Sequence, residues 1–262
     1  MRTPADEELL SGGNATVGAV VRVGGTVRKP WQPTTPQVAA FLQHLRERGV
    51  DVPAHLGRDA QGRQIIEYIP GDIAMHRGVL EHDLLRRIGA YLRSIHDAAE
   101  DFPVPEPPEQ WPVLLPAAAP DLICHNDAAS WNLVLSGERG AERIVLIDAD
   151  GAGPSTRLWD LAYPAISFPL LDAGQEPSLA AARLRAFVDG YDPDRSMTDL
   201  REALAPALAL RARAMYEHLR AAHESGEEPW ATMFVEGHGE HWRMRAEYIE
   251  TYGIHWERAV RA

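Results

Sequence analysis

The chain has 262 residues, of which 45% are hydrophobic and 24% are charged, a composition typical of a soluble globular protein. Its formal net charge of −12 argues against a nucleic-acid partner, since neutralising a phosphate backbone requires clustered cations. No apolar run reaches the roughly 18 residues of a membrane span, and the amino terminus lacks the apolar core of a secretory signal, so we expect a cytoplasmic protein without a membrane partner.

The amino-terminal part of the chain predicts a small antiparallel sheet that carries one helix. Residues 16–29 favour two strands about a Gly-Gly turn, and residues 35–49 show helical spacing of their apolar residues. A second hairpin is predicted at 55–72, with its last strand over 64–69. The expected order is therefore strand, strand, helix, strand, strand.

The rest of the chain is mainly helical in pattern. Residues 83–99 predict a strongly amphipathic helix, and a proline-rich connector follows it. A further hairpin is predicted over 133–148, and from Ser178 onward nearly every segment shows helical spacing. We predict an α+β fold of two lobes, a small antiparallel β-rich lobe with one helix over residues 1–71 and a larger, mainly helical lobe over residues 72–262.

The polar residues around the third hairpin suit phosphoryl transfer. Asp127 and Asn132 lie on the loop before its first strand, and Asp148 ends its second strand. Because a hairpin brings its two ends together, Asn132 and Asp148 should lie side by side. A carboxylate and a carboxamide oxygen suit Mg²⁺, which also takes oxygens from substrate phosphates. Asp127 is then free to accept a proton from a hydroxyl group.

This pattern resembles the aminoglycoside phosphotransferase family, which has a protein-kinase-like fold. The spacing of His125, Asp127 and Asn132, with Asp148 on the next strand, is similar to the catalytic loop and metal-binding aspartate of that family. Asp160 stands in a following Asp-Leu-Ala segment and by resemblance braces the catalytic loop. The likeness runs from residue 12 to about residue 170. It implies a kinase that uses ATP or GTP together with Mg²⁺.

The same resemblance implies residues for the nucleotide. Gly13, Asn14 and Thr16 would lie over the triphosphate, with backbone N–H groups directed at its oxygens. Arg28 would reach the α and β phosphates, whereas Lys29 would face the opposite side of the strand. Residues 35–45 of the predicted helix contain no Asp or Glu, which departs from the usual lysine–glutamate pair and leaves open what orients the cation.

A second group of nucleotide contacts is implied at the junction of the two lobes. The carbonyl of Glu67 and the N–H of Ile69 would hold the adenine. In the catalytic segment, Asn126 replaces the usual glycine, which makes a positive φ less easy without forbidding it. Asp150 either touches a second metal ion or caps the turn after the strand.

The function favoured by these residues is transfer of the γ-phosphoryl group to a hydroxyl of a small molecule, such as an aminoglycoside or another antibiotic. Two alternatives stay open. One is a catalytically silent nucleotide-binding or immunity protein on the same fold. The other is a kinase of a primary metabolite, such as an amino alcohol or a sugar. The sequence does not indicate the oligomeric state.

Overall fold

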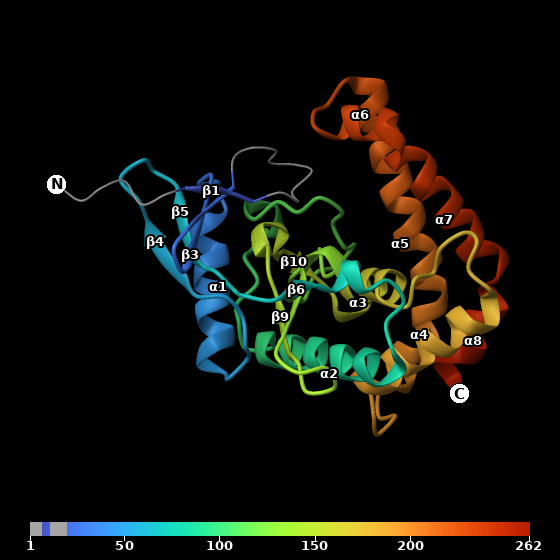
Figure 1. Ribbon diagram of the computed structural model, residues 1–262. Helices are drawn as coiled ribbons and strands as arrows, with labels where there is room; N and C mark the ends of the chain where they lie inside the picture. Colours follow the sequence, from blue (N-terminus) through green and yellow to red (C-terminus); the bar gives the residue numbers. More distant parts are fainter. Residues whose placement is uncertain (1–6, 11–19) are drawn as a thin grey trace.

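The computed structural model describes residues 7–10 and 20–262, and it contains two lobes (Figure 1). Three of the expected nucleotide-binding residues, Gly13, Asn14 and Thr16, lie outside the described residues. The amino-terminal lobe holds a five-stranded antiparallel sheet in the order β1-β2-β3-β5-β4, with one helix, α1. Its elements are β1 (Glu8–Leu9), β2 (Val21–Val23), β3 (Thr26–Lys29), α1 (Thr35–Glu47), β4 (His55–Arg58) and β5 (Gln64–Glu67).

The carboxy-terminal lobe combines two small sheets with a set of helices, so the predicted α+β class is confirmed. Strands β6, β8 and β9 form one sheet, and β7 pairs with β10. Short 3₁₀ turns η1 (Ala74–Arg77) and η2 (Pro108–Gln110) flank α2, and η3 (Ser130–Asn132) and η4 (Ala149–Gly151) lie between strands. The strands are β6 (Asp72–Ile73), β7 (Leu122–Cys124), β8 (Leu133–Ser136), β9 (Arg143–Leu146) and β10 (Gly153–Ser155). The helices are α2 (His82–Ala99), α3 (Arg157–Ser167), α4 (Pro177–Tyr191), α5 (Thr198–Ser225), α6 (Trp230–Met233), α7 (Gly239–Thr251) and α8 (Gly253–Arg261), with a π-helical turn η5 (Phe234–His238) between α6 and α7.

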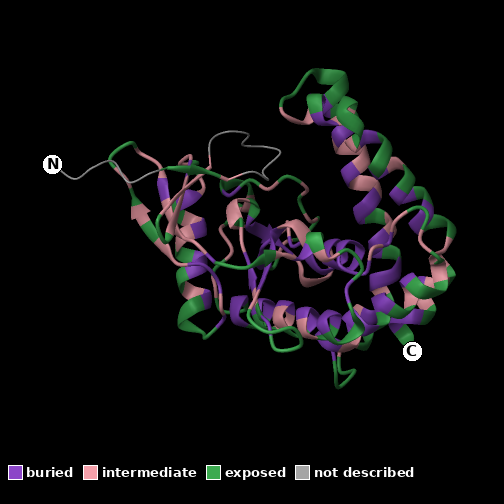
Figure 2. Ribbon diagram, in the orientation of Figure 1, coloured by how far each residue is buried: buried purple, intermediate pink, exposed green. Residues whose placement is uncertain are grey.

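The amphipathic helix α2 lies below the strands of the carboxy-terminal lobe in Figure 1 and packs against α4 and β7. Its apolar stripe is buried, as the spacing predicts, and Figure 2 shows the buried side of α2 turned toward the strands and the other helices. Each buried leucine or isoleucine contributes on the order of 1.5–3 kcal/mol of hydrophobic stabilisation. The residues of the stripe are Leu84, Leu85, Ile88, Leu92 and Ile95.

Helices α2 and α4 cross with their backbones in contact. A Cβ atom built on Gly190 would lie 2.0 Å from the carbonyl oxygen of Arg86, and one built on Gly89 would lie 2.2 Å from that of Phe187. Only glycine fits at these two positions. The close crossing places His96 of α2 beside Tyr191 of α4, with 2.7 Å between the Nδ1 atom and the hydroxyl oxygen.

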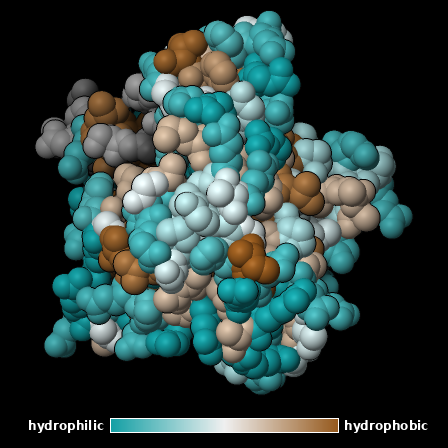
Figure 3. Space-filling model, turned by 90° about the vertical axis from the view of Figure 1, so that its right-hand side faces the viewer, coloured by the Kyte–Doolittle hydropathy of each residue, from teal (hydrophilic) through white to brown (hydrophobic). Residues whose placement is uncertain are grey.

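The surface shows no continuous apolar face on the side drawn in Figure 3. That face is mostly hydrophilic, and its hydrophobic side chains form separate spots. Exposed hydrophobic side chains of the helical lobe include Leu179, Leu210, Val235 and Ile254. Within residues 7–10 and 20–262, no helix combines the length and the apolar character needed to cross a bilayer.

Candidate active site

The loop after β7 brings Asp127 and Asn132 together. The Asn132 side chain donates through Nδ2 to the Asp127 carboxylate at 2.8 Å and to the Asp127 backbone carbonyl at 3.0 Å. The Asn132 carbonyl accepts a hydrogen bond from the N–H of Ile147 at 2.8 Å, so Asn132 lies beside the end of β9, directly before Asp148. The hairpin therefore gathers these three residues at one end.

Asn132 and Asp148 have the donor set that Mg²⁺ prefers. Because the Asn132 amide nitrogen donates to Asp127, its oxygen is the atom left to coordinate a cation. Asp148 adopts a left-handed backbone conformation, with φ 61° and ψ 54°. Aspartate adopts this conformation more readily than most residues with a side chain, and here it turns the chain directly after β9. An amide oxygen beside a carboxylate makes a hard, oxygen-only site, which fits Mg²⁺.

The surroundings of Asp127 raise the pKa of its carboxyl group. Burial raises the pKa of Asp127 to about 7, and the nearby charge of Asp148 adds to the rise, while interactions with Asn132, Arg211 and Tyr163 oppose it. A carboxyl group with a pKa near neutrality is well matched to exchange a proton with a hydroxyl group.

Asn126 does adopt the positive φ that the sequence leaves open. Its φ is 62°, and its backbone N–H donates to the Asp160 carboxylate at 2.5 Å. The Asn126 side chain also donates to the carbonyls of Gly151 and Gly153, at 3.3 and 3.2 Å. Asparagine tolerates this conformation better than other residues with a side chain. The catalytic loop is therefore braced by Asp160, as the family resemblance implies.

Asp160 is itself held by His96. The His96 Nε2 atom lies 2.8 Å from the Asp160 carboxylate, and both side chains are fully buried. Burial alone would raise the pKa of Asp160, but the hydrogen bonds from His96 and from the backbone N–H of Asn126 hold it below its ordinary value. Together with the buried Cys124, His96 and Asp160 form a group whose ligand atoms are close enough for a metal ion. Their hydrogen bonds to each other and to Asn126 instead describe a brace for the loop.

His125 is a packed residue of the loop. Its Nε2 atom lies 3.2 Å from the carbonyl oxygen of Ile147, and its Nδ1 atom accepts a hydrogen bond from the N–H of Asp127 at 3.3 Å. This pattern requires the neutral ring with its proton on Nε2. Burial lowers the pKa of His125, which favours the same neutral form. His125 thus orients the loop through its contacts with Ile147 and Asp127.

The structure places Lys29, and not Arg28, beside the β8–β9 hairpin, so the expectation that Lys29 faces away from this site is wrong. The Lys29 ammonium pairs with the carboxylate of Asp148 and lies 2.7 Å from that of Asp150. Arg28 lies on the other face of the strand, where it donates to the Thr26 hydroxyl at 2.6 Å and pairs with Asp59 at 3.6 Å. Successive side chains of a strand point to opposite faces, so only one of these two cations can reach the hairpin.

The buried ammonium of Lys29 is kept charged by these carboxylates. Burial alone would lower the pKa of Lys29, but Asp148 and Asp150 together hold it above its ordinary value. Asp150 also accepts a hydrogen bond from the Gln64 side chain at 3.3 Å. Asp150 therefore contacts the sheet of the amino-terminal lobe, which the turn-capping and second-metal interpretations did not foresee.

Glu67 and Ile69 lie where the chain passes between the lobes. The Glu67 carboxylate accepts a hydrogen bond from the N–H of Ala54 at 3.0 Å. The Ile69 side chain is buried against Val134 and Val145 of the catalytic hairpin. These contacts fix the connecting segment on both lobes. The roles of the Glu67 carbonyl and the Ile69 N–H toward a nucleobase stay predictions.

The sequence reasoning missed Arg211 on α5. Arg211 is 5% exposed, and its guanidinium lies 4.4 Å above the ring centre of Tyr163 and 3.4 Å from the carbonyl oxygen of Asn126. Its Nη1 atom has no hydrogen-bond partner among the described residues. Burial lowers the pKa of Arg211. A recognisable signal exists, because Arg211 stands on the same buried stripe of α5 as Leu208 and Met215.

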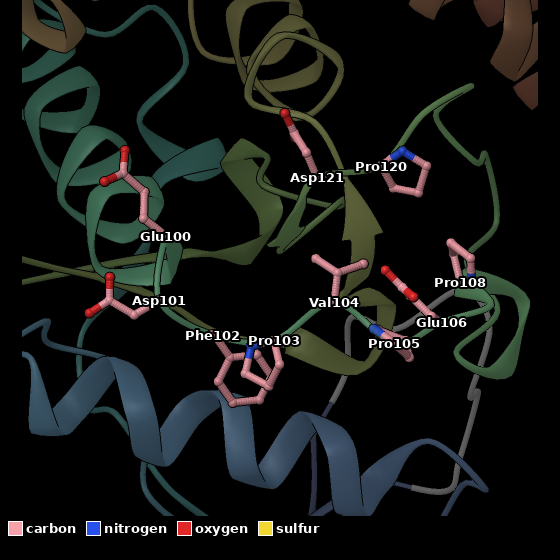
Figure 4. A pocket seen from close by; sticks show the side chains of 10 residues that line it. All are labelled: Glu100, Asp101, Phe102, Pro103, Val104, Pro105, Glu106, Pro108, Pro120 and Asp121. Carbon is pink, nitrogen blue, oxygen red and sulfur yellow. The ribbon is translucent and has the colours of Figure 1, made fainter.

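A hollow of about 550 Å³ lies apart from these residues, between the end of α2, the proline-rich connector and the start of β7 (Figure 4). Its lining includes four acidic residues but none of the expected site residues. The acidic residues are Glu100, Asp101, Glu106 and Asp121. The hairpin, and not this hollow, therefore defines the candidate site.

Comparison with known sequences identifies relatives over most of the chain. A family model described as the phosphotransferase enzyme family matches residues 12–113 and 108–197. A trifolitoxin immunity protein from Rhizobium leguminosarum bv. trifolii is 30% identical over 203 residues, which cover 72% of this chain and 76% of that protein.

Comparison with solved structures shows the fold. A choline/ethanolamine kinase family protein from Mesorhizobium loti has a TM-score of 0.64 at 17% identity, covering 98% of this chain and 93% of its own. An amicoumacin kinase in complex with AMP-PNP and Ca²⁺ has a TM-score of 0.64 at 13% identity, covering 95% and 89%. An aminoglycoside 2′-phosphotransferase-IIIa in complex with GDP has a TM-score of 0.53 at 15% identity, covering 95% and 92%. The expected kinase-like, two-lobed fold is confirmed.

Proposed function

This chain belongs to the phosphotransferase enzyme family, and on that premise we propose that it transfers the γ-phosphoryl group of ATP to a hydroxyl group of a small molecule, with Mg²⁺ as cofactor. Its class, a small-molecule phosphotransferase with a hydroxyl acceptor, follows from the family. The nucleotide, the metal and the acceptor are the parts that we propose. GTP is the alternative donor, and a related phosphotransferase fold has been solved with GDP.

The observation that carries the proposal is the grouping of Asp127, Asn132 and Asp148 at the end of one hairpin. Asn132 touches Asp127 at 2.8 Å, and Asp148 is near enough to raise the pKa of Asp127. A base next to an oxygen-only metal pair is the arrangement that phosphoryl transfer requires.

In the proposed reaction, the hydroxyl oxygen of the acceptor bonds to the γ-phosphorus, and the Asp127 carboxylate accepts the proton that this hydroxyl loses. The bond between that phosphorus and the β–γ bridging oxygen breaks, and ADP leaves. Asn132 and Asp148 would hold Mg²⁺, which when bound neutralises charge on the phosphate oxygens. Asn132 also keeps Asp127 in place through its amide nitrogen.

Lys29 takes the nucleotide role that the sequence assigned to Arg28. Its ammonium is already directed at the metal aspartate, so we propose that it contacts the α and β phosphates. The Glu67 carbonyl and the Ile69 N–H remain the proposed contacts of the adenine. Gly13, Asn14 and Thr16 remain the proposed cover of the triphosphate.

The acceptor would bind on the helical side of Asp127. Tyr163 of α3 lies there, with its ring stacked on Trp242 of α7 at 5.9 Å and edge-on to Trp131 at 6.2 Å. Tyr163 and Trp242 are both buried, so this aromatic group supports the site from within the core and sets no limit on the class of acceptor. An antibiotic and a primary metabolite both remain within this description.

A second candidate function is immunity without catalysis, because one relative is named as an immunity protein. Such a protein would bind its toxin or a nucleotide and turn over neither. The intact trio of Asp127, Asn132 and Asp148 supports catalysis instead, since binding alone does not require a base beside a metal pair.

The test is acceptor-dependent ADP release by the purified protein, measured together with calorimetric binding of Mg–ATP. The acceptor panel spans aminoglycosides, macrolides, other amino sugars, choline-like amines and neutral sugars. We expect at least one acceptor to raise ADP release above the hydrolytic background. Binding of Mg–ATP with no productive acceptor would favour the immunity candidate. Absence of nucleotide binding would contradict both.

A further inference from the structure

The buried ammonium of Lys29 needs a carboxylate partner, including when nucleotide and metal are bound. Its side chain is only 7% exposed, and an ammonium group removed from water must be paired. Two carboxylates meet it, those of Asp148 and Asp150, and both belong to the carboxy-terminal lobe. Lys29 itself stands on β3 of the amino-terminal lobe.

Helix α1 does not supply this counter-charge. It packs near η4, yet it has no acidic residue in its first turn. Its acidic residue, Glu47, ends the helix and is hydrogen-bonded to Gln43 at 2.9 Å. The helix faces the lobe interior with Val38, Phe41 and Leu42 instead. Because the acidic residue of α1 lies at the last position of the helix and is bound to Gln43, the pairing of Lys29 is left to Asp148 and Asp150.

Asp148 cannot serve Lys29 alone. If Asp148 binds Mg²⁺, as we propose, its negative charge is shared with a divalent cation, and its attraction for the ammonium falls. Asp150 is then the carboxylate that continues to hold Lys29. This step rests on the proposed function.

Asp150 is anchored in a way that suits this role. One carboxylate oxygen lies 2.7 Å from the Lys29 ammonium, and the other accepts a hydrogen bond from Gln64 at 3.3 Å. Gln64 is 1% exposed, and its amide nitrogen also donates to the carbonyl of Pro30 at 3.0 Å. Lys29 and Gln64 are opposite each other in the β3–β5 pairing. Two cross-strand neighbours of one lobe thus hold one carboxylate of the other.

We propose that Asp150 is a positioning residue, which fixes the Lys29 ammonium over the phosphate site and joins the two lobes there through Lys29 and Gln64. It takes the place of the helix glutamate that this chain lacks. Asp150 acts through Lys29 and not as a ligand of the metal.

A double-mutant cycle tests this role, with calorimetric affinity for Mg–ADP as the measurement. The variants are Lys29→Met, Asp150→Asn and the double variant. Asp150→Asn alone should weaken Mg–ADP binding on the order of tenfold, because it releases Lys29, and should add less than about threefold in the Lys29→Met background, because coupled residues are not additive. Asp59→Asn, which removes the partner of Arg28 on the opposite face, serves as the matched control and should change the affinity less than about twofold.

Gln64→Leu gives a second measurement that does not alter a charge. It should weaken Mg–ADP binding when Asp150 is present and should have no further effect beside Asp150→Asn. The Mg²⁺ concentration required for half-maximal ADP binding should be nearly the same in wild type and Asp150→Asn.

Additive effects of Lys29→Met and Asp150→Asn would overturn the inference. The inference would also be overturned if Asp150→Asn raised the Mg²⁺ requirement tenfold and this rise persisted in the Lys29→Met background. That result would indicate that Asp150 is a ligand of the metal. Failure of the wild type to bind Mg–ADP would remove the proposed function along with the inference, whereas wild-type binding with an additive cycle would remove the inference alone.

Discussion

The catalytic hairpin and the sheet of the amino-terminal lobe hold their functional side chains by different means. In the hairpin, β8 is buried over its first three residues and β9 over its last two. In the sheet, every residue of β2 and most residues of β3 and β5 are half-buried. Packing of the hairpin strands therefore fixes the positions of Asn132 and Asp148. The position of the Lys29 ammonium is fixed instead by ion pairs with two carboxylates of the other lobe.

Because of this difference, substitutions in the two regions should have different kinetic effects. Asp127, Asn132 and Asp148 stand on or beside the buried β8–β9 hairpin, so changes there should act on the chemical step or the metal. Lys29 depends on its partners, so changes there should act on nucleotide affinity. Four substitutions, in order of decreasing expected effect, test whether the division holds.

Replacing Asp127 should have the largest effect. Asp127→Asn removes the proposed base, and a positioned base contributes ~10²–10⁴-fold, so kcat should fall by at least that order. Affinity for Mg–ATP should stay within about twofold of the wild type, because neither a metal ligand nor a phosphate contact is lost. Asp121→Asn, an exposed carboxylate six residues earlier, is the control for ADP release and calorimetry. Full activity in Asp127→Asn would contradict the assignment.

Replacing Asp148 should remove the metal-dependent part of nucleotide binding. A ligand at a hundred times its Kd stabilises a protein by about 2.7 kcal/mol, which for a chain of this size raises Tm by roughly 5–10 °C. We expect Mg–ATP to produce such a shift in the wild type and to produce little more than ATP alone in Asp148→Ala. Thermal scans of both proteins with ATP, with and without Mg²⁺, measure the Mg²⁺-dependent shift in Tm. An undiminished Mg²⁺-dependent shift would mean that the metal binds elsewhere.

The two neighbouring cations of β3 should differ in their effect on the nucleotide. Lys29→Met should raise KM for ATP about 10–100-fold, the effect of losing one or more charge-assisted hydrogen bonds of ~1.5–3 kcal/mol. Arg28→Met should raise it less than about threefold, since Arg28 pairs with Asp59 on the other face. Steady-state kinetics at saturating acceptor decide between them. Equal effects would contradict the assignment of the phosphate contact to Lys29, and the reverse order would return that contact to Arg28.

Replacing Arg211 should have the smallest effect of the four, and like the changes in the hairpin it should alter kcat and not KM for ATP. Arg211→Met removes a buried cation beside Asp127, and we expect kcat to fall about tenfold, equivalent to roughly 1.4 kcal/mol of transition-state stabilisation. KM for ATP should not change. Arg213→Met removes an exposed pair with Glu250 on the same helix and provides the control. If Arg211→Met altered KM for ATP instead, the division between the two regions would fail.

The sequence allowed the hairpin site to be predicted because its parts are close along the chain. Asp127, Asn132 and Asp148 lie within 22 residues, and the strongly apolar strands between them admit one register. The bracing role of Asp160 came instead from the family resemblance, because Asp160 and Asn126 are 34 residues apart.

The contacts of the nucleotide lobe could not be derived in the same way. Arg28 and Lys29 are adjacent cations on a short, half-buried strand, and a shift of one residue exchanges the faces of both. The pairing that decides between them joins Lys29 to Asp148, 119 residues away. Arg211 is likewise 85 residues from Asn126, and only the packing of α5 against the loop brings it near Asp127.

The crossing of α2 and α4 has a consequence for anyone who would redesign the acceptor preference of this protein. Gly89 and Gly190 leave no space for a methyl group, and the crossing they permit sets the contact between His96 and Tyr191. His96 in turn holds Asp160, which holds Asn126. A mutant library can therefore vary the exposed positions of α5 and α7 freely, but it should keep both glycines fixed, because a larger residue at either would change the catalytic loop from a distance.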